Sequence, residues 1–324
     1  MADDKPIWLT RKIVVYSDSP DSLKPLRDLI RSFGWSLADI KPTLAEALSM
    51  IRQGQASIVI ADESPNSPFF LTQRQMIADE IGCLTPLMGI VTAQKKMDKE
   101  LLMRIGSPDI IERPFSPATF IPGFSNVLRK WETKLFTAIR ASQMRLMRGQ
   151  RSQGLGMLQK LTEYPPVQNL AQIALAIDMM QTGKPMECER FLLSAINRSP
   201  GNITLFILLG QLYLNYASPR LALNLFTKAQ MAFKQTPILL PDIIQAHIML
   251  NNFDSAIGLM QDLVSQDYMR TTLVGFLART LMAAGMTDKL SILLGDRIDI
   301  IQSIRKSWNH AENFQAKEQP IMVS

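Results

Sequence analysis

The chain has very few of the side chains that most metal and acid–base sites need. Its 324 residues include two cysteines, Cys83 and Cys188, and two histidines, His247 and His310. Two distant cysteines argue against a disulfide framework and against a zinc cluster, and they fit a reducing compartment. Two histidines leave little room for histidine-based acid–base or metal chemistry. We therefore predict a cytoplasmic protein.

Long apolar runs are also missing. Hydrophobic residues make up 47% of the chain and charged residues 20%, yet no run approaches the length of a membrane span. Residues 1–6 are polar and acidic, so we expect no secretory signal and no membrane partner. This composition is typical of a globular protein, and 324 residues favour two domains over a single core.

Basic residues only mildly outnumber acidic ones, which gives the chain a net charge of +6. Basic residues gather between Arg129 and Arg151, where Glu132 is the only acid. On a helix these basic residues would not share one face, as a nucleic-acid stripe would. We therefore expect an acidic protein partner rather than nucleic acid. The sequence leaves a homodimer open.

Residues 1–122 alternate between short apolar runs and amphipathic segments. Such alternation predicts a doubly wound parallel sheet of five strands with helices on both faces, and thus an α/β fold. The expected strands cover residues 12–18, 36–40, 56–62, 86–93 and 109–115. The expected helices cover residues 19–33, 43–54, 73–81 and 98–105.

Polar residues stand where four of these expected strands end: Asp18, Asp62, Thr92 and Arg113. The carboxyl ends of parallel strands meet at one edge of a sheet, where ligands bind. Two carboxylates and a hydroxyl there could hold Mg²⁺, which prefers oxygen ligands. A metal beside a carboxylate can neutralise an incoming phosphoryl group. An Asp that merely begins a loop is the alternative interpretation of Asp62 alone.

Four segments, in this order, resemble the receiver domain of bacterial two-component response regulators: residues 14–21, 58–62, 90–93 and 113–117. The resemblance covers residues 11–130 and implies a flavodoxin-like fold. It implies that Asp62 accepts phosphate from a histidine kinase or phosphotransfer protein. It also implies that Asp18 and Asp62 bind Mg²⁺, and that Thr92 and Arg113 contact the phosphoryl group.

The chain departs from the receiver pattern at four positions. Ser17 replaces an acid, Arg113 replaces the usual lysine, and Ile110 replaces an aromatic residue that moves on activation. Pro65 follows Asp62 by three residues instead of the usual four. Arginine keeps the charge of lysine but not its shape, so this change is not conservative at a tight site. Both an active receiver and a degenerate one that only docks remain open.

A period of 34 residues organises the second half. Leu209, Gly210 and Tyr213, followed by Ala222, Phe226, Ala229 and Pro237, resemble the tetratricopeptide repeat. Weaker copies at the same spacing extend the pattern in both directions. The resemblance implies an all-α solenoid of about five helical hairpins over residues 135–308, followed by a disordered tail at 309–324. Residues 123–149 form a helical junction, either as one continuous helix or as two helices with a short joint.

Repeats of this family bind a peptide or helix of a target protein in a groove. The groove positions should lie on the first helix of each hairpin, and register places there Ile177, Gln181, Thr204, Gln211, Asn215, Gln245 and Met249. An ordinary solvent-facing residue is the alternative at each position.

The sequence therefore predicts a two-component-type signalling adaptor in which the receiver-like domain controls protein binding by the array. The alternative is a constitutive scaffold whose receiver is degenerate and never phosphorylated. We predict no enzymatic activity, because no nucleophile–base pair is visible.

Overall fold

A parallel sheet forms from the apolar runs of the N-terminal half. The computed structural model describes residues 11–17, 24–62, 69–92, 109–233, 237–265 and 281. The strands pair in parallel in the order β2-β1-β3-β4-β5, which confirms the predicted five-stranded sheet. Their bounds are β1 Lys12–Tyr16, β2 Ser36–Lys41, β3 Ile58–Asp62, β4 Leu87–Thr92 and β5 Asp109–Arg113.

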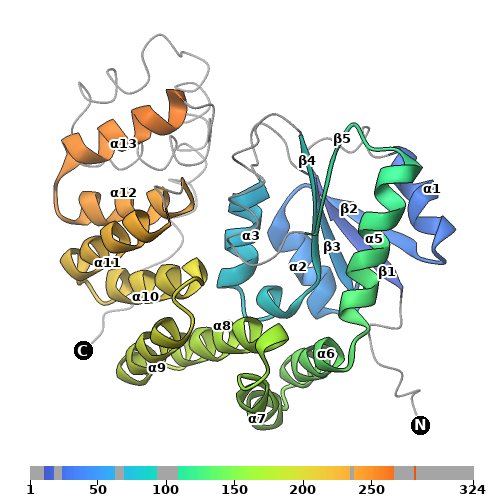
Figure 1. Ribbon diagram of the computed structural model, residues 1–324, viewed down its shortest axis with the longest axis horizontal. Helices are drawn as coiled ribbons and strands as arrows, with labels where there is room; N and C mark the ends of the chain where they lie inside the picture. The colour runs from blue at the N-terminus through green and yellow to red at the C-terminus, as the bar shows by residue number, and fades with distance from the viewer. Residues whose placement is uncertain are drawn as a thin grey trace, which may run out of the picture. The chain divides into compact units, whose positions relative to one another are not determined.

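Helices cover both faces of the sheet (Figure 1). Ile13 and Val15 of β1 share a core with α1 (Lys24–Ser32) and α5 (Pro117–Trp131). Val14, between them, points to the opposite face and shares a second core with α2 (Leu44–Arg52) and α3 (Phe69–Ala78). Alternate residues of a strand point to opposite faces, so one apolar run serves two helical layers.

Two details differ from the sequence-based expectation for this half. The helix expected over residues 73–81 begins earlier, because α3 spans Phe69–Ala78, and a separate 3-10 turn, η3 (Gly82–Leu84), follows it. The expected helix over residues 98–105 lies outside the described residues.

The junction consists of two helices rather than one. Helix α5 ends at Trp131 and α6 (Lys134–Met147) begins after Thr133, whose backbone is extended. The rings of Trp131 and Phe136 meet across this joint, with centroids 5.0 Å apart. The structure therefore supports the interpretation of two helices with a short joint.

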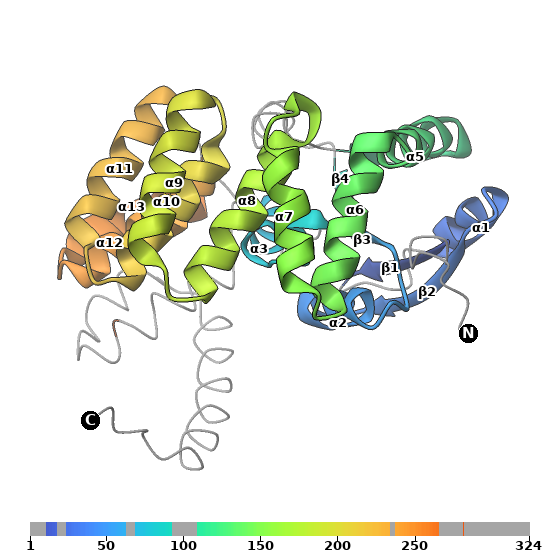
Figure 2. The ribbon, with the colours of Figure 1, turned by 90° about the horizontal axis from the view of Figure 1, so that it is seen from below.

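Within the described residues, α6 is followed by α7 Arg151–Leu161, α8 Pro165–Gln181, α9 Pro185–Arg198, α10 Ile203–Asn215, α11 Pro219–Ala232, α12 Leu240–Met249 and α13 Phe253–Ser265. A 3-10 turn, η4 (Pro237–Leu239), precedes α12. From α6 to α11, each helix packs against the next one in the chain. Figure 2 shows α6, α7 and α8 side by side.

The predicted period of 34 residues recurs in the backbone itself. Helices α7, α9, α11 and α13 begin at Arg151, Pro185, Pro219 and Phe253, so that successive starts are 34 residues apart. Two residues before each start, one residue adopts a positive φ angle: Gly149, Gly183, Ala217 and Asn251. The same turn therefore leads into the second helix of each pair, although glycine supplies it in only two of the four.

Buried side chains follow the same period. Ser142, Ala176, Gly210 and Ile244 are buried at 34-residue intervals on α6, α8, α10 and α12. The partner helices α7, α9, α11 and α13 carry buried residues at the same interval: Gly154, Cys188, Ala222 and Ala256. A Cβ atom on Gly210 would overlap the ring of Phe226, so glycine is required where α10 crosses α11. Seven of these eight residues are small, and Ile244 is the exception.

The contacts divide the chain into two compact units, Met1–Asp242 and Ile243–Ser324. In the first unit, one continuous core runs from Ile13 of β1 to Leu212 of α10. In the second unit, Ile244, Ala246, Ala256 and Met260 are buried. The division therefore falls inside α12 and not at the predicted junction over residues 123–149.

Candidate functional site

Asp62 ends the central strand β3, at the carboxyl edge of the sheet. The strand order changes direction between β1 and β3, and ligands of doubly wound sheets bind outside such a point. Asp62 is 4% exposed, so its carboxylate lies within the fold. A buried carboxylate is stable only when other groups compensate its charge.

Two neighbouring groups compensate that charge. The hydroxyl of Ser17, which follows β1, donates a hydrogen bond to Asp62 Oδ2 at 2.8 Å. The guanidinium of Arg113, at the end of β5, pairs with Asp62 Oδ1. Ser17 itself is held in place because its backbone N–H donates to the carbonyl of Lys41 at 3.0 Å. Both carboxylate oxygens of Asp62 are therefore engaged by groups of the same fold.

The other residues predicted for this site are only partly placed. The backbone of Thr92 pairs with Arg113 at the carboxyl ends of β4 and β5, as the strand pattern predicted. The side chain of Thr92 and the whole of Asp18 lie outside the described residues. The structure thus brings Asp62 and Arg113 into contact and leaves the roles of Thr92 and Asp18 as predictions.

Within the described residues, Asp62 alone represents the predicted magnesium site, because Asp18 lies outside them and its role stays a prediction. Magnesium prefers several anionic or neutral oxygen ligands in an octahedron. Asp62 instead faces a guanidinium, whose positive charge would repel the ion, and a hydroxyl that donates to the carboxylate. Among the described residues, no group of three or more His, Cys, Asp or Glu side chains could hold a metal.

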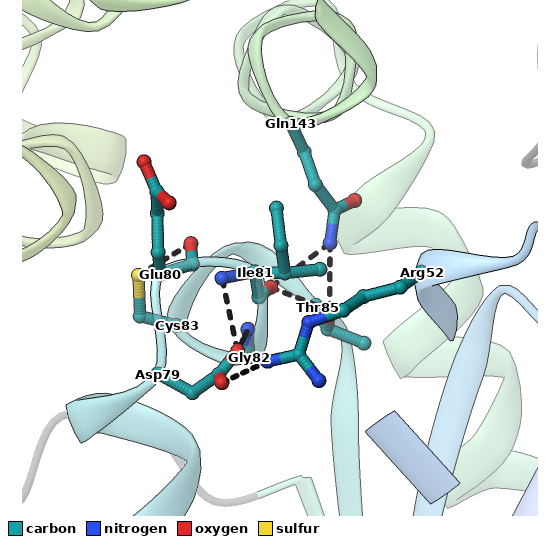
Figure 3. Close-up of polar contacts among 8 residues, drawn as sticks. All are labelled: Arg52, Asp79, Glu80, Ile81, Gly82, Cys83, Thr85 and Gln143. Atoms are coloured by element: carbon teal, nitrogen blue, oxygen red, sulfur yellow. Dashed lines mark hydrogen bonds and ion pairs between the residues drawn. The ribbon is translucent and has the colours of Figure 1, made fainter. Parts of the chain in front are cut away.

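A second polar cluster lies at the opposite, amino edge of the sheet, around η3 (Figure 3). Asp79 accepts from the backbone N–H groups of Ile81 and Gly82, at 3.0 and 2.7 Å, and pairs with Arg52 of α2. Gln143 of α6 donates to the carbonyl of Ile81 at 3.0 Å and to the hydroxyl of Thr85 at 2.6 Å. Side chains from α2 and α6 therefore hold this turn from two sides.

Arg151, at the start of α7, adds to this cluster. Its guanidinium lies 3.1 Å from Glu80 and also pairs with Asp178 of α8. Burial raises the pKa of Glu80 above its ordinary value, and the charge of Arg151 acts in the opposite direction. Helix α7 is thus linked to the sheet region by an ion pair as well as by the shared core.

Helix α3 makes a further contact with the helical region of the first unit. Arg74 donates to the carbonyl of Ile238 at 3.2 Å and pairs with Asp242, which is 1% exposed. Burial raises the pKa of Asp242, while Arg74 and Gln211 lower it. A side chain of the sheet's own helix therefore engages the residue next to the predicted groove position Gln211.

The predicted groove residues fall into three groups by burial. Ile177 and Thr204 are buried, at 3% and 1% exposure. Side chains this deeply buried do not line an open groove. Gln211 and Gln245 are partly buried, whereas Gln181, Asn215 and Met249 are exposed. The prediction for Ile177 and Thr204 is therefore corrected.

Sequence reasoning missed the amino-edge residues Arg52, Asp79, Gln143 and Arg151, and also the separate pair of Arg74 and Asp242. Arg74 and Asp242 are 168 residues apart, and Gln143 and Ile81 are 62 residues apart. Separations of this size leave no periodic signal in a single sequence. The signal for Ser17 is its position directly after β1, where the receiver resemblance expects an acid.

Among the described helices, none combines the length and apolar character that crossing a membrane requires. No protein-family model matches the chain, and no curated protein matches its sequence.

Proposed function

We propose that this chain is a protein-interaction scaffold that pairs a receiver-like sheet with a solenoid of tetratricopeptide-like hairpins and works without phosphate on Asp62. The observation that carries the proposal is the state of the Asp62 carboxylate. Ser17 and Arg113 engage its two oxygens inside the fold. A carboxylate compensated in this way needs no metal ion, and a phosphoryl group on either oxygen would displace the partner of that oxygen.

The sheet supports the receiver-like half of the proposal. Its order, β2-β1-β3-β4-β5, is that of flavodoxin-like doubly wound folds. Asp62 and Arg113 occupy the strand ends that the receiver resemblance assigns to the acceptor and to the conserved cation. The chain therefore keeps the acceptor and the cation of the receiver pattern. Where the pattern has an acid that would help to bind a metal, this chain has Ser17.

The helical region supports the solenoid half. Helix starts, positive-φ turns and buried, mostly small residues all recur every 34 residues. Such arrays have no chemistry of their own, because each hairpin only buries its apolar face against its neighbours. The proposal accordingly assigns no reaction on an outside substrate, and it takes a protein segment as the ligand.

The shared core favours a scaffold over a switch. Sheet and helical pairs in the first unit bury a continuous set of apolar side chains, and Gln143, Arg151 and Arg74 add polar links. A change at Asp62 would have to overcome these contacts to reorient the hairpins. The surface left for a partner includes exposed apolar side chains of α9 and α11: Met186, Leu193, Leu221 and Met231.

The experiment that tests the proposal is intact-mass measurement after incubation with Mg²⁺ and acetyl phosphate. We expect no mass increase in the wild type or in Asp62→Asn. Titration calorimetry with Mg²⁺ should also give no saturable heat. A gain of one phosphate in the wild type alone would contradict the scaffold.

That outcome would support the second candidate, a phosphorylation-controlled adaptor. The observation in its favour is the position of Asp62 at the carboxyl end of a central strand, beside the change in strand order. In that case Arg113 would exchange its carboxylate partner for the phosphoryl group. Asp62→Asn should then abolish any phosphate-dependent change in the affinity for a target protein.

A further inference from the structure

The segment formed by α3 and η3, residues 69–84, lies against the first helices of several hairpins. Helices α6 and α8 pack against η3, and α3 packs against η4, which leads into α12. Side chains of α3, η3, α8 and α10 line one common cavity. All of these contacts fall within the first unit of the chain. We call the surface formed by α6, α8 and α10 the first-helix face, and the α3–η3 segment lies on it.

Burial along α8 shows how closely this face is covered. Residues 171–178 are all buried, although they span more than two turns of the helix. Gln172 and Ile177 are buried, whereas Phe206 and Gln211, one period later on α10, are only partly buried. Helices α6, α7, α9 and α10 pack against α8 within the helical region, and η3 packs against it from the sheet. The sheet therefore supplies part of the cover that buries α8.

At the α3 end, an arginine of the segment reaches the helical region. Arg74 donates to the carbonyl of Ile238 at 3.2 Å and pairs with Asp242. Asp242 is buried, and Gln211 of α10 also bonds to its carboxylate. A buried carboxylate needs such partners, so Arg74 stabilises the charged form of Asp242 while the segment is in place.

At the η3 end, the hairpins supply the donors. Gln143 of α6 donates to the carbonyl of Ile81 at 3.0 Å, as Figure 3 shows. Arg151, at the start of α7, lies 3.1 Å from Glu80. A backbone carbonyl and a carboxylate of the segment are thus held by side chains of the hairpins. Main-chain hydrogen bonds and charge pairs of this kind hold a peptide ligand in its groove.

The sheet holds the turn of the segment in the shape that the hairpins contact. Asp79 accepts from the backbone N–H groups of Ile81 and Gly82, and it pairs with Arg52 of α2. These bonds lie within the sheet and its own helices. A segment that is already ordered loses less conformational freedom on binding than a free peptide does.

We propose that the α3–η3 segment is an internal ligand of the hairpins, which closes the first-helix face to partner proteins. This inference rests on the proposed function of the helical region as a protein-binding array. In the repeats that this region resembles, the first helices form the face that binds a target segment, and here the same chain supplies the occupant. A partner that uses this face must displace the segment. It also needs a basic side chain for Asp242 and an acidic one for Arg151.

The two native cysteines report whether the segment can leave its place. Cys83 lies in η3, and Cys188 of α9 lies between hairpin helices, with its Sγ 3.5 Å from the carbonyl of Ala176. Both are buried. Release of the segment exposes Cys83 alone, whereas global unfolding exposes both. With iodoacetamide and the full chain, we expect peptide mass analysis to show Cys83 modified about tenfold faster than Cys188, or more.

Two variants weaken the segment without changing the hairpins. Arg74→Met removes a buried pair and should speed modification of Cys83 about tenfold or more. Glu80→Gln should speed it about threefold, because Arg151 is 42% exposed in that pair. Since Arg74 bonds to Ile238 and Asp242, its effect on Cys83 reports release of the whole segment rather than fraying of η3.

Matched controls are Arg190→Met and Glu163→Gln, at exposed positions on α9 and directly after α7. They should leave the modification rate of Cys83 as in the wild type, and Cys188 should keep its rate in every variant. All measurements are made without Mg²⁺ or a phosphodonor. Their outcome is therefore separate from the phosphorylation test of Asp62.

A synthetic peptide of residues 69–85, carrying Cys83→Ser, tests whether the face accepts a ligand from outside. In the double variant Arg74→Met and Glu80→Gln, about 1 mM peptide should raise the modification rate of Cys83 about twofold or more, as expected for a dissociation constant of about 1 mM or lower. A scrambled peptide should have no effect.

Two results would overturn the proposal. The first is modification of Cys83 and Cys188 at equal rates in the wild type and in both single variants, which would make the contact a permanent part of the core. The second is a double variant whose Cys83 rate does not respond to the peptide, which would show that the face binds no segment in trans.

Discussion

At the carboxyl edge of the sheet, Asp62 meets partners that stand at the ends of neighbouring strands. At the amino edge, η3 meets Gln143 and Arg151 from helices that follow the sheet. The first arrangement depends only on the strand order, so local motifs point to it. The second depends on how the hairpins fold back under the sheet, as Figure 1 shows for α6 and α8. Polar groups at the two edges therefore have different origins, and the two edges should respond differently to substitution.

The largest expected effect is at the carboxyl edge. Arg113→Met leaves the buried carboxylate of Asp62 without its cation, and breaking a buried pair from one side is strongly destabilising. We expect the free energy of unfolding to fall by about 3 kcal/mol, measured by urea denaturation.

The matched control is Arg52→Met at the amino edge. Arg52 is 45% exposed in its pair with Asp79, so its loss should cost below about 1 kcal/mol. Equal losses in the two variants would show that burial of Asp62 does not distinguish the two edges.

The next effect is at the amino edge. A Cβ atom on Gly82 would lie 2.7 Å from the backbone carbonyl oxygen of Met76, so Gly82→Ala forces η3 to shift. We expect a loss of about 2 kcal/mol in thermal or urea unfolding. Gly156→Ala in α7 is the control, because nothing lies within 4 Å of the added atom. Alanine favours the helix there, and that variant should gain up to about 1 kcal/mol.

A smaller effect tests the link between η3 and α6. Gln143→Met keeps the length of the side chain but removes its hydrogen bonds to the Ile81 carbonyl and the Thr85 hydroxyl. Thr85 still donates to the same carbonyl at 2.7 Å, which limits the damage. The expected loss is about 1 kcal/mol. Hydrogen exchange should also become faster at the amides of residues 81–85, and unchanged exchange there would refute the link.

The smallest effect is expected within the hairpins, away from both edges. The Tyr213 hydroxyl donates to Glu189 Oε1 at 2.8 Å, and burial together with Glu189 raises the pKa of Tyr213 to about 12. Tyr213→Phe should cost about 0.5 kcal/mol at neutral pH.

The pH dependence of this last effect has a definite sign. A folded-state pKa above the unfolded value of about 10 means that the stabilisation is complete below pH 10 and is lost as the pH rises toward 12. The difference between wild type and Tyr213→Phe should therefore shrink over this range in urea unfolding. A difference that grows with pH would contradict the assignment.

The fold was predictable to the extent that periodicity is local. Apolar runs of five or six residues between amphipathic segments predicted the parallel sheet, and a 34-residue period predicted the paired helices. The turn η3 was not predictable, because three residues carry no period. The joint after Trp131 was not predictable either, because neither Gly nor Pro stands at Glu132 or Thr133.

The candidate site divides in the same way. Strand ends alone placed Asp62 and Arg113 at one edge, since parallel strands must end together. They did not predict that the hydroxyl of Ser17, at a position where an acid was expected, donates a hydrogen bond to Asp62. The burial of Ile177 and Thr204 also escaped the register argument, since register says which residues share a face but not what covers that face.

By itself the sequence determined the alternation that produces the sheet, the 34-residue spacing of the helices, and the identity of the polar residues at the strand ends. The sheet alternation and the helix spacing depend on hydrogen bonding and side-chain direction over a few residues. Any chain with this pattern therefore forms the same elements. The tertiary structure alone decided that the sheet and the hairpins of the first unit share one core and that residues of both line a common cavity. The reason is that packing brings together residues distant in the chain, such as Gln73 and Thr204, whose proximity has no local signature.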